Sequence, residues 1–171
     1  MPVTPPPDLR FRIAAKSDCD AILRALQELA ASLGVPERLR STREGLERHG
    51  FGERPEFEVM LAEDAGGFAG MCLYFPFFST WVGEPGIYVQ DLYVDAARRG
   101  AGIGERLLRE VARRGLGNGY THLRLTVDDG NAGGAKFYHR LGFEKSPDEY
   151  VHKLAGDGFL RFCLPPGHNE Q

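Results

Sequence analysis

The stretch Val94-Asp-Ala-Ala-Arg98-Arg99-Gly100-Ala101-Gly102-Ile103-Gly104-Glu105 decides the fold, because it joins an expected strand to an expected helix. Residues 87–94 before it are rich in β-branched and aromatic side chains, as strands are. Residues 104–116 carry apolar side chains at helical spacing. Glycines let the backbone approach a ligand closely, and the N–H groups that open a helix attract phosphate. With Arg98 and Arg99 beside them, these glycines predict a pyrophosphate-binding loop.

The spacing within this loop distinguishes between the known phosphate-binding motifs. A dinucleotide-binding GxGxxG motif needs glycine where the chain has Glu105 or Leu107, and the Gly-Lys-Ser/Thr of a Walker A loop is missing. The pattern Arg99-x-x-Gly102-x-Gly104 instead resembles the R/Q-x-x-G-x-G/A signature of the GNAT family of N-acetyltransferases. In that family the loop binds the pyrophosphate of acetyl-CoA. A glycine-rich turn without a ligand is the alternative.

A second segment strengthens the resemblance. Residues 131–143 read Asn-Ala-Gly-Gly-Ala-Lys-Phe-Tyr-His-Arg-Leu-Gly-Phe and are similar to the family's second CoA-contacting segment. The resemblance implies that Tyr138 is the catalytic acid that protonates the leaving thiolate. It implies acetyl-CoA as cosubstrate, with no metal, and the following cofactor-binding residues: Leu92, Tyr93 and Val94 through their backbone, Arg99, Gly100, Ala101, Gly102, Ile103 and Gly104 in the loop, and Asn131 and Lys136 beyond it.

The chain also resembles one branch of the family, the diamine (spermidine/spermine) N-acetyltransferases. The similarity lies in residues 18–30, 50–55, 81–83 and 88–91. It implies an amine site formed by Asp91, Gln90, Trp81 and Leu33. Two acids of that branch are replaced here, one by Gln90 and one by Leu33. These losses favour a smaller or less cationic amine than a polyamine, such as an amino acid or a lysine analogue. Arg38 and Arg40 are candidates for receiving its carboxylate, or are solvated surface charges.

Several of these residues have a second interpretation. Tyr138 beside Phe137 also fits a core tyrosine with a satisfied hydroxyl. Asn131 also fits the N-cap of the helix that follows, and both roles are compatible. Asp91 also fits a strand-end residue bonded to nearby backbone. Trp81 either lines the amine site or packs on the sheet edge.

Helical and strand patterns alternate along the chain, which predicts a single α/β (α+β) domain. We expect a GNAT-type fold with a mixed, mostly antiparallel sheet of about six to seven strands and about four helices. Residues 1–9 are expected to be a loose proline-rich leader, 10–164 the N-acetyltransferase domain and 165–171 a tail. The expected strands are 10–14, 57–61, 68–75, 87–94 and 123–127, with weaker candidates from 143 onward and at 159–164. The expected helices are 18–33, 41–50, 104–116 and 131–141.

Composition argues against a nucleic-acid-binding, a metal-binding or a membrane protein. The 171 residues carry a formal charge of −3, so nucleic acid is not expected as a main partner. The three cysteines show no metal-binding spacing. The most apolar stretch, residues 68–78, is shorter than the roughly 20 residues that a membrane helix needs, and the first residues show no signal peptide. These observations predict a cytoplasmic protein without membrane contact.

The resulting functional prediction is an acetyl-CoA-dependent N-acetyltransferase acting on a small primary amine. The amine attacks directly within a ternary complex. A peptide or protein acceptor and a non-catalytic acyl-CoA-binding regulator are the alternatives. Bulky Trp81 and the expected long loop 33–56 favour a closed acceptor cleft over an open peptide groove. The branch resemblance implies a homodimer, and residues 159–164, read as a strand, are a candidate for pairing with the partner chain.

Overall fold

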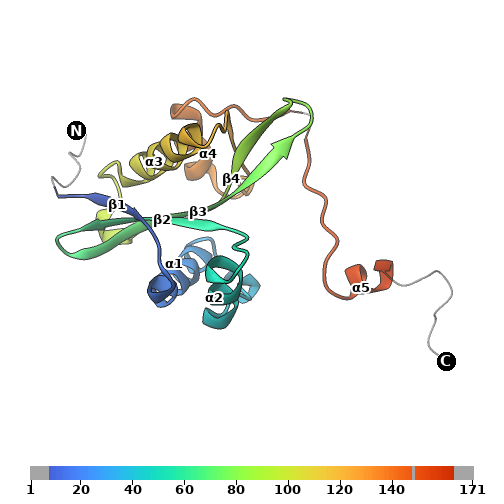
Figure 1. The fold of residues 1–171 in the computed structure, drawn as a ribbon, viewed down its shortest axis with the longest axis horizontal. Helices are drawn as coiled ribbons and strands as arrows, with labels where there is room; N and C mark the ends of the chain where they lie inside the picture. Colours follow the sequence, from blue (N-terminus) through green and yellow to red (C-terminus); the bar gives the residue numbers. More distant parts are fainter. Residues whose placement is uncertain (1–7, 148, 164–171) are drawn as a thin grey trace. The chain divides into compact units, whose positions relative to one another are not determined.

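A five-stranded sheet in the order β1-β2-β3-β4-β5 is the framework of the computed structural model, which describes residues 8–147 and 149–163 (Figure 1). Neighbouring strands are antiparallel except β4 and β5, which run parallel. The strands are β1 (Arg10–Ile13), β2 (Glu58–Asp64), β3 (Gly67–Ser79), β4 (Glu84–Val94) and β5 (Leu123–Leu125). The mixed sheet and the α/β class are therefore as the sequence predicts.

Helices cover both faces of the sheet. α3 packs on β2, β3 and β4, whereas α1 and α2 lie on the opposite face (Figure 1). The α-helices are α1 (Cys19–Ser32), α2 (Arg43–Phe51), α3 (Ile103–Gly117), α4 (Ala132–Arg140) and α5 (Asp157–Cys163), and the short 3-10 helices are η1 (Lys16–Asp18), η2 (Pro36–Arg38) and η3 (Ala96–Arg98). The chain divides into two units, Met1–Ala135 and Lys136–Gln171, and each is described by itself.

The core on the α1 face explains why α1 and α2 lie there. Ile22, Ala25 and Leu26 of α1 and Leu46 of α2 are buried against the sheet. The sheet contributes Val59, Leu61, Met71, Leu73 and Tyr93 to the same cluster. Burying such side chains is the main stabilising term of a domain of this size, at about 25 cal/mol per Å² of apolar surface.

Three expectations need correction. Five strands are present in the described residues instead of six to seven, and residues 157–163 form α5 where a strand was expected at 159–164. The continuous apolar run there fits either structure, and Asp157 in the first turn favours a helix. Leu164 lies outside the described residues. α2 begins at Arg43 instead of at residue 41, because the Thr42 hydroxyl accepts from the Gly45 N–H at 3.1 Å and caps the helix there.

β3 continues through Pro76 to Ser79. Its pairing with β2 ends at Tyr74, so Pro76 has β4 as a neighbour on one side and no described strand on the other. Proline lacks an N–H group and is tolerated at such an edge.

The first two described residues are fixed to the domain. Leu9 is buried, and Asp8 accepts a hydrogen bond from the Ala65 N–H at 2.7 Å.

Candidate active site

The glycine loop between β4 and α3 has the backbone conformation that glycine permits. Gly100 and Gly102 have φ of 81° and 74°, in the left-handed region that other residues avoid. Gly102 is the N-cap of α3, and among the described residues no atom beyond its chain neighbours and the helix backbone lies within 4 Å of where its Cβ would be. The N–H groups of residues 103–105 open the helix and have no intrahelical partner. The loop therefore presents helix-opening N–H groups beside open space, which suits a phosphate group.

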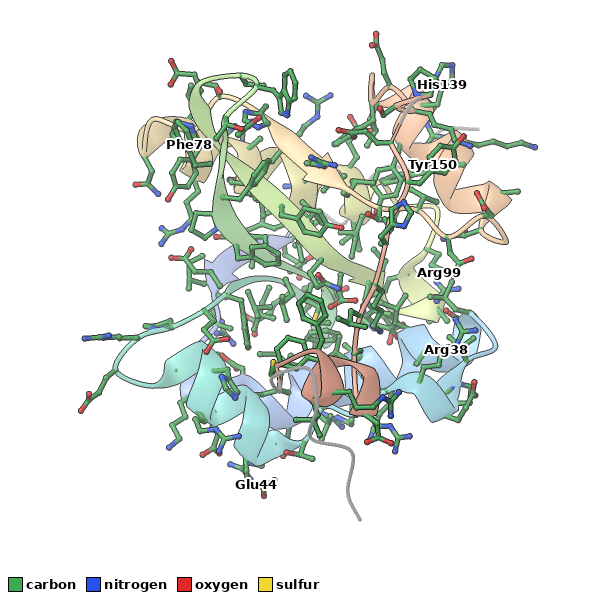
Figure 2. The ribbon with its side chains drawn as sticks, turned by 90° about the vertical axis from the view of Figure 1, so that its right-hand side faces the viewer. Arg38, Glu44, Phe78, Arg99, His139 and Tyr150 are labelled. Atoms are coloured by element: carbon green, nitrogen blue, oxygen red, sulfur yellow. The ribbon has the colours of Figure 1, made fainter. Side chains whose placement is uncertain are left out.

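The two arginines before the loop have different surroundings. Arg99 is exposed, and its Nε donates to the Val94 carbonyl oxygen at 3.1 Å (Figure 2). Arg98 was expected to add charge beside the phosphate. It instead donates from Nε to Asp64 Oδ2 at 2.6 Å and is largely buried. Arg99 is therefore the arginine next to the loop whose charge is available to a ligand.

Next to this loop one edge of β4 has no strand partner among the described residues, and we call it the open edge. β5 pairs with β4 only from Ile87 to Val89, and β4 then continues to Val94 with β3 on its other side. The Asp95 N–H donates to the Ala69 oxygen on the β3 side at 3.0 Å. Because backbone groups alternate in direction along a strand, the N–H groups of Leu92 and Val94 point to the open edge. The N–H of Tyr93 points toward β3.

A β-bulge in β4 changes the face of the sheet on which the Asp91 side chain lies. Leu73 pairs with Asp91 and Tyr74 with Val89, so Gln90 is the extra residue of β4. Cross-strand partners carry their side chains on the same face, and Leu73 belongs to the core under α1. Without the bulge Asp91 would face α3, whereas with it the carboxylate lies on the α1 face.

The Asp91 side chain is half-buried there and makes no hydrogen bond or ion pair with any described residue. Burial raises the pKa of Asp91 to about 6. The alternative, a strand-end residue bonded to nearby backbone, therefore does not describe it. A half-buried carboxylate with this pKa is ionised at neutral pH and is a stronger base than an ordinary aspartate. The exposed Gln90 at the bulge carries no charge.

α4 carries the residues of the second motif. The Asn131 side-chain oxygen accepts from the Gly134 N–H at 2.8 Å, so Asn131 caps this helix. Lys136 is exposed on α4. The Tyr138 ring makes edge contacts with Phe137 and Phe143, with ring centroids 5.1 and 5.5 Å apart. Both Lys136 and Tyr138 belong to the second unit.

Two residues of the expected amine site are exposed in the described chain. Trp81 lies at the tip of the β3–β4 hairpin and is 99% exposed, so it neither packs on the sheet edge nor lines a cleft there. The hairpin extends beyond β2, whose pairing with β3 ends at Tyr74, and Figure 2 shows Phe78 on the same hairpin. Leu33 is 44% exposed at the end of α1. Residues 33–56 contain η2 and α2, so they do not form one long closing loop.

A side-chain contact that the sequence did not reveal joins α1 to β4. The Tyr93 hydroxyl donates to Glu28 Oε2, and Tyr93 lies on the same sheet face as Asp91. Burial, followed by the hydrogen bond to Glu28, raises the pKa of Tyr93 to about 12. The sequence places residues 27–30 in the family resemblance, but helical periodicity does not identify a partner for Glu28 on a distant strand.

A surface cavity of about 490 Å³ lies between β1, β2 and the end of α3, away from the glycine loop. Its arginines are paired, Arg12 with Asp18 and Glu63 and Arg114 with Glu58. The cavity offers no unpaired guanidinium among these, so the glycine loop and the open edge of β4 remain the candidate site.

Among residues 8–147 and 149–163, no three His, Cys, Asp or Glu side chains are grouped as metal ligands. No helix in the same part of the chain has the length and apolar character to cross a membrane.

Comparisons with known proteins agree with this geometry. A family model described as "Acetyltransferase (GNAT) family" matches residues 22–143. Thialysine N-epsilon-acetyltransferase of Sus scrofa is 37% identical over 140 residues, which cover 77% of this chain and 82% of the relative. An L-ornithine N5-acetyltransferase of Arabidopsis thaliana is 28% identical, over 52% of this chain and 39% of the relative. Among solved structures, an integron cassette protein of V. cholerae superposes with a TM-score of 0.76 at 20% identity, over 91% of this chain and 97% of its own.

Proposed function

The chain belongs to the acetyltransferase (GNAT) family and is an N-acetyltransferase, and from this premise we propose which molecules it uses. The cosubstrate is acetyl-CoA, and the acceptor is a primary amine of a small molecule that attacks directly within a ternary complex. The observation that carries the proposal is the open edge of β4. Backbone N–H groups, a glycine loop and an unpaired half-buried Asp91 converge on this one strand.

The residues of the loop and the strand fit the parts of acetyl-CoA. The helix-opening N–H groups of Ile103 and Gly104 suit the pyrophosphate, with Arg99 adding positive charge. The N–H groups of Leu92 and Val94 suit the pantetheine arm and the thioester carbonyl, where an oxyanion develops during transfer. Gly100, Ala101, Asn131 and Lys136 complete the binding residues that the family resemblance implies.

The reaction requires the nitrogen of the ammonium to lose two protons and the sulfur to gain one. An alkyl ammonium has a pKa of about 10.4, so roughly one molecule in a thousand is neutral at pH 7.4. Asp91, with its pKa raised to about 6, accepts the proton that the ammonium loses, directly or through water. The amine nitrogen then bonds to the carbonyl carbon while the C–S bond breaks. Tyr138 donates a proton to the departing sulfur, and the second proton leaves the new amide nitrogen and restores the Tyr138 hydroxyl directly or through water.

The acceptor is a lysine-like or ornithine-like amino acid in preference to a polyamine. Asp91 is the acid left at the bulge, beside neutral Gln90, and Leu33 offers no charge at the end of α1. A long polycation would therefore meet few counter-charges along its length. The relatives named for thialysine and ornithine act on amino acids with a terminal amine. Arg38, exposed on η2 (Figure 2), is the candidate partner for the acceptor's carboxylate.

The release of free CoA thiol from acetyl-CoA tests this proposal. We expect fast release with thialysine, lysine and ornithine, and turnover at least tenfold lower with spermidine and putrescine at equal concentration. Preference for spermidine would overturn the amino-acid assignment and leave the acetyltransferase chemistry intact. Turnover with a short peptide alone would assign a protein acceptor. CoA binding without turnover on any amine would assign a regulatory acyl-CoA-binding protein.

We also infer that the protein is a cytoplasmic homodimer. Large apolar side chains are exposed in the second unit, beyond what a monomer usually leaves in water. They are Tyr150, Val151, Leu154, Phe159, Leu160 and Phe162. Because residues 157–163 are helical, the contact would be a helix packing instead of the strand pairing expected from the sequence. Sedimentation equilibrium is expected to give twice the chain mass, and a monomer at micromolar concentration would refute the inference.

A further inference from the structure

Arg98 lies just before the glycine loop in the sequence. Its side chain is bonded to Asp64, the last residue of β2, at the turn to β3. Its Nε donates to Asp64 Oδ2 at 2.6 Å and its Nη2 donates to Asp64 Oδ1 at 3.1 Å. The side chains of Arg98 and Asp64 are only 24% and 12% exposed. The guanidinium holds the pKa of Asp64 below its ordinary value, so the pair stays charged at neutral pH.

The turn that carries Asp64 is itself fixed. The Gly66 N–H donates to Asp64 Oδ1 at 2.8 Å, and the Ala65 N–H donates to Asp8 at 2.7 Å. A Cβ atom on Gly66 would lie 2.5 Å from Arg98 Nη2, so the guanidinium packs directly on the turn. Asp64 is therefore a fixed anchor, unlike a mobile surface acid.

On its other side, Arg98 ends η3, the short helix that leads into the glycine loop. The Asp95 carboxylate caps η3 by accepting from the Ala97 N–H at 2.9 Å, and it also lies 3.5 Å from Arg98 Nη1. Arg99, Gly100, Ala101 and Gly102 follow directly. Two of these four residues are left-handed glycines, which have the greatest conformational freedom. Arg98 thus ties the start of the loop to the end of β2 through Asp64, whereas Arg99 is bonded only to the Val94 carbonyl of its own strand, β4.

We propose that Asp64 is a positioning residue for acetyl-CoA: through Arg98 it holds the glycine loop in the conformation that receives the pyrophosphate. This inference rests on the proposed function, in which the loop binds acetyl-CoA. Without the Asp64–Arg98 pair the glycines sample other conformations, and the apparent affinity falls by the fraction of chains with a competent loop. The acceptor site and the chemistry at Asp91 are unaffected, because neither contacts the turn.

The test is Asp64→Ala, with Asp18→Ala as a matched control. Asp18 also receives two guanidinium bonds, from Arg12 at 2.7 and 2.9 Å, and one backbone N–H, from Ala15 at 2.7 Å. Both variants lose an arginine–aspartate pair and one backbone contact. We expect Asp64→Ala to raise the Kd of CoA and the KM of acetyl-CoA about five- to tenfold, with kcat and the amine KM unchanged. We expect Asp18→Ala to leave all four values unchanged.

Two further variants keep the result interpretable. Should Asp64→Ala not fold, Asp64→Asn keeps a hydrogen-bonding side chain and is expected to give a smaller increase of the same kind. The exchange of Asp64→Arg with Arg98→Asp is expected to restore at least part of the CoA affinity that either single variant loses. An equal change of CoA affinity in the Asp64 and Asp18 variants, or a loss of kcat alone, would overturn the positioning role.

A variant of the glycine loop itself separates this inference from the proposed function. Gly102→Val places a β-branched side chain at a φ of 74° and into the open space before α3. We expect it to weaken CoA binding more than tenfold. If Gly102→Val weakens binding and Asp64→Ala does not, the loop assignment stands and the positioning role of Asp64 is refuted. If neither variant changes CoA binding, both the loop assignment and the positioning role fail.

Discussion

The Asp91→Asn variant is expected to be more stable than the natural protein and about 100-fold less active toward the amine. The activity loss is that of removing a general base, a group that typically contributes a factor of about 10² to 10⁴. It is expected in kcat/KM for the amine, whereas the KM of acetyl-CoA stays nearly constant. The variant loses the charge at the bulge of β4 and keeps the shape of the side chain.

The expected gain in stability follows from the pKa of Asp91, which burial raises from 3.8 to about 6. The folded chain then binds this proton more tightly than the unfolded chain does. The free energy of unfolding therefore decreases as the pH rises from about 4 to 6, and the full loss is present at neutral pH. Asparagine carries no charge, so Asp91→Asn avoids this decrease in the free energy of unfolding. We place the difference on the order of 1–2 kcal/mol after allowing for the partial exposure of the side chain. Urea unfolding at pH 7 and pH 4 measures the difference, which is expected only at pH 7.

The pH dependence of activity provides the second measurement for this variant. In the natural protein kcat/KM for the amine is expected to fall about tenfold per pH unit below pH 6, as Asp91 becomes protonated. Asp91→Asn is expected to lack this acidic limb. Glu84→Gln is the control, because Glu84 is an exposed carboxylate at the start of the same strand. An Asp91→Asn variant that retains both the rate and the acidic limb would show that another group accepts the proton.

The sequence predicted the parts of this site that depend on neighbouring residues. The expected helix 104–116 is α3 at Ile103–Gly117, because its apolar spacing and the glycines at both ends are local signals. The glycine loop likewise depends on residues that adopt a left-handed conformation wherever the fold places them. The cap of α4 by Asn131 was predicted for the same reason.

The contacts that the sequence did not predict are between distant residues. Arg98 and Asp64 are 34 positions apart, and Tyr93 and Glu28 are 65 apart. No periodic pattern identifies such pairs, because they depend on how the sheet brings strands and helices together. The bulge at Gln90 has the same origin, since register is set by the whole strand pair, and alternation within β4 alone would place Asp91 on the wrong face.

The Tyr138→Phe variant is expected to lower kcat about 100-fold or more while the Kd of CoA stays unchanged. Phenylalanine keeps the ring that packs at 5.1 Å on Phe137 and 5.5 Å on Phe143, so the change removes the hydroxyl alone. If Tyr138 donates the proton that the departing sulfur needs, its loss leaves a thiolate to depart without an acid. The ordinary pKa of a tyrosine, about 10, lies above that of a thiol, about 8.5, so the transfer needs a site that perturbs one of them.

Two comparisons decide between a catalytic and a structural tyrosine. Tyr150→Phe is the control, since Tyr150 belongs to the same unit and is 80% exposed; it is expected to leave kcat unchanged. Acetyl thioesters of increasingly acidic thiols should restore the rate of Tyr138→Phe, because a thiol of lower pKa departs without protonation. The natural protein should respond little to the same series, since its acid compensates for a poor leaving group. A uniform rate loss with all thioesters, together with a lowered Tm, would instead assign Tyr138 to packing.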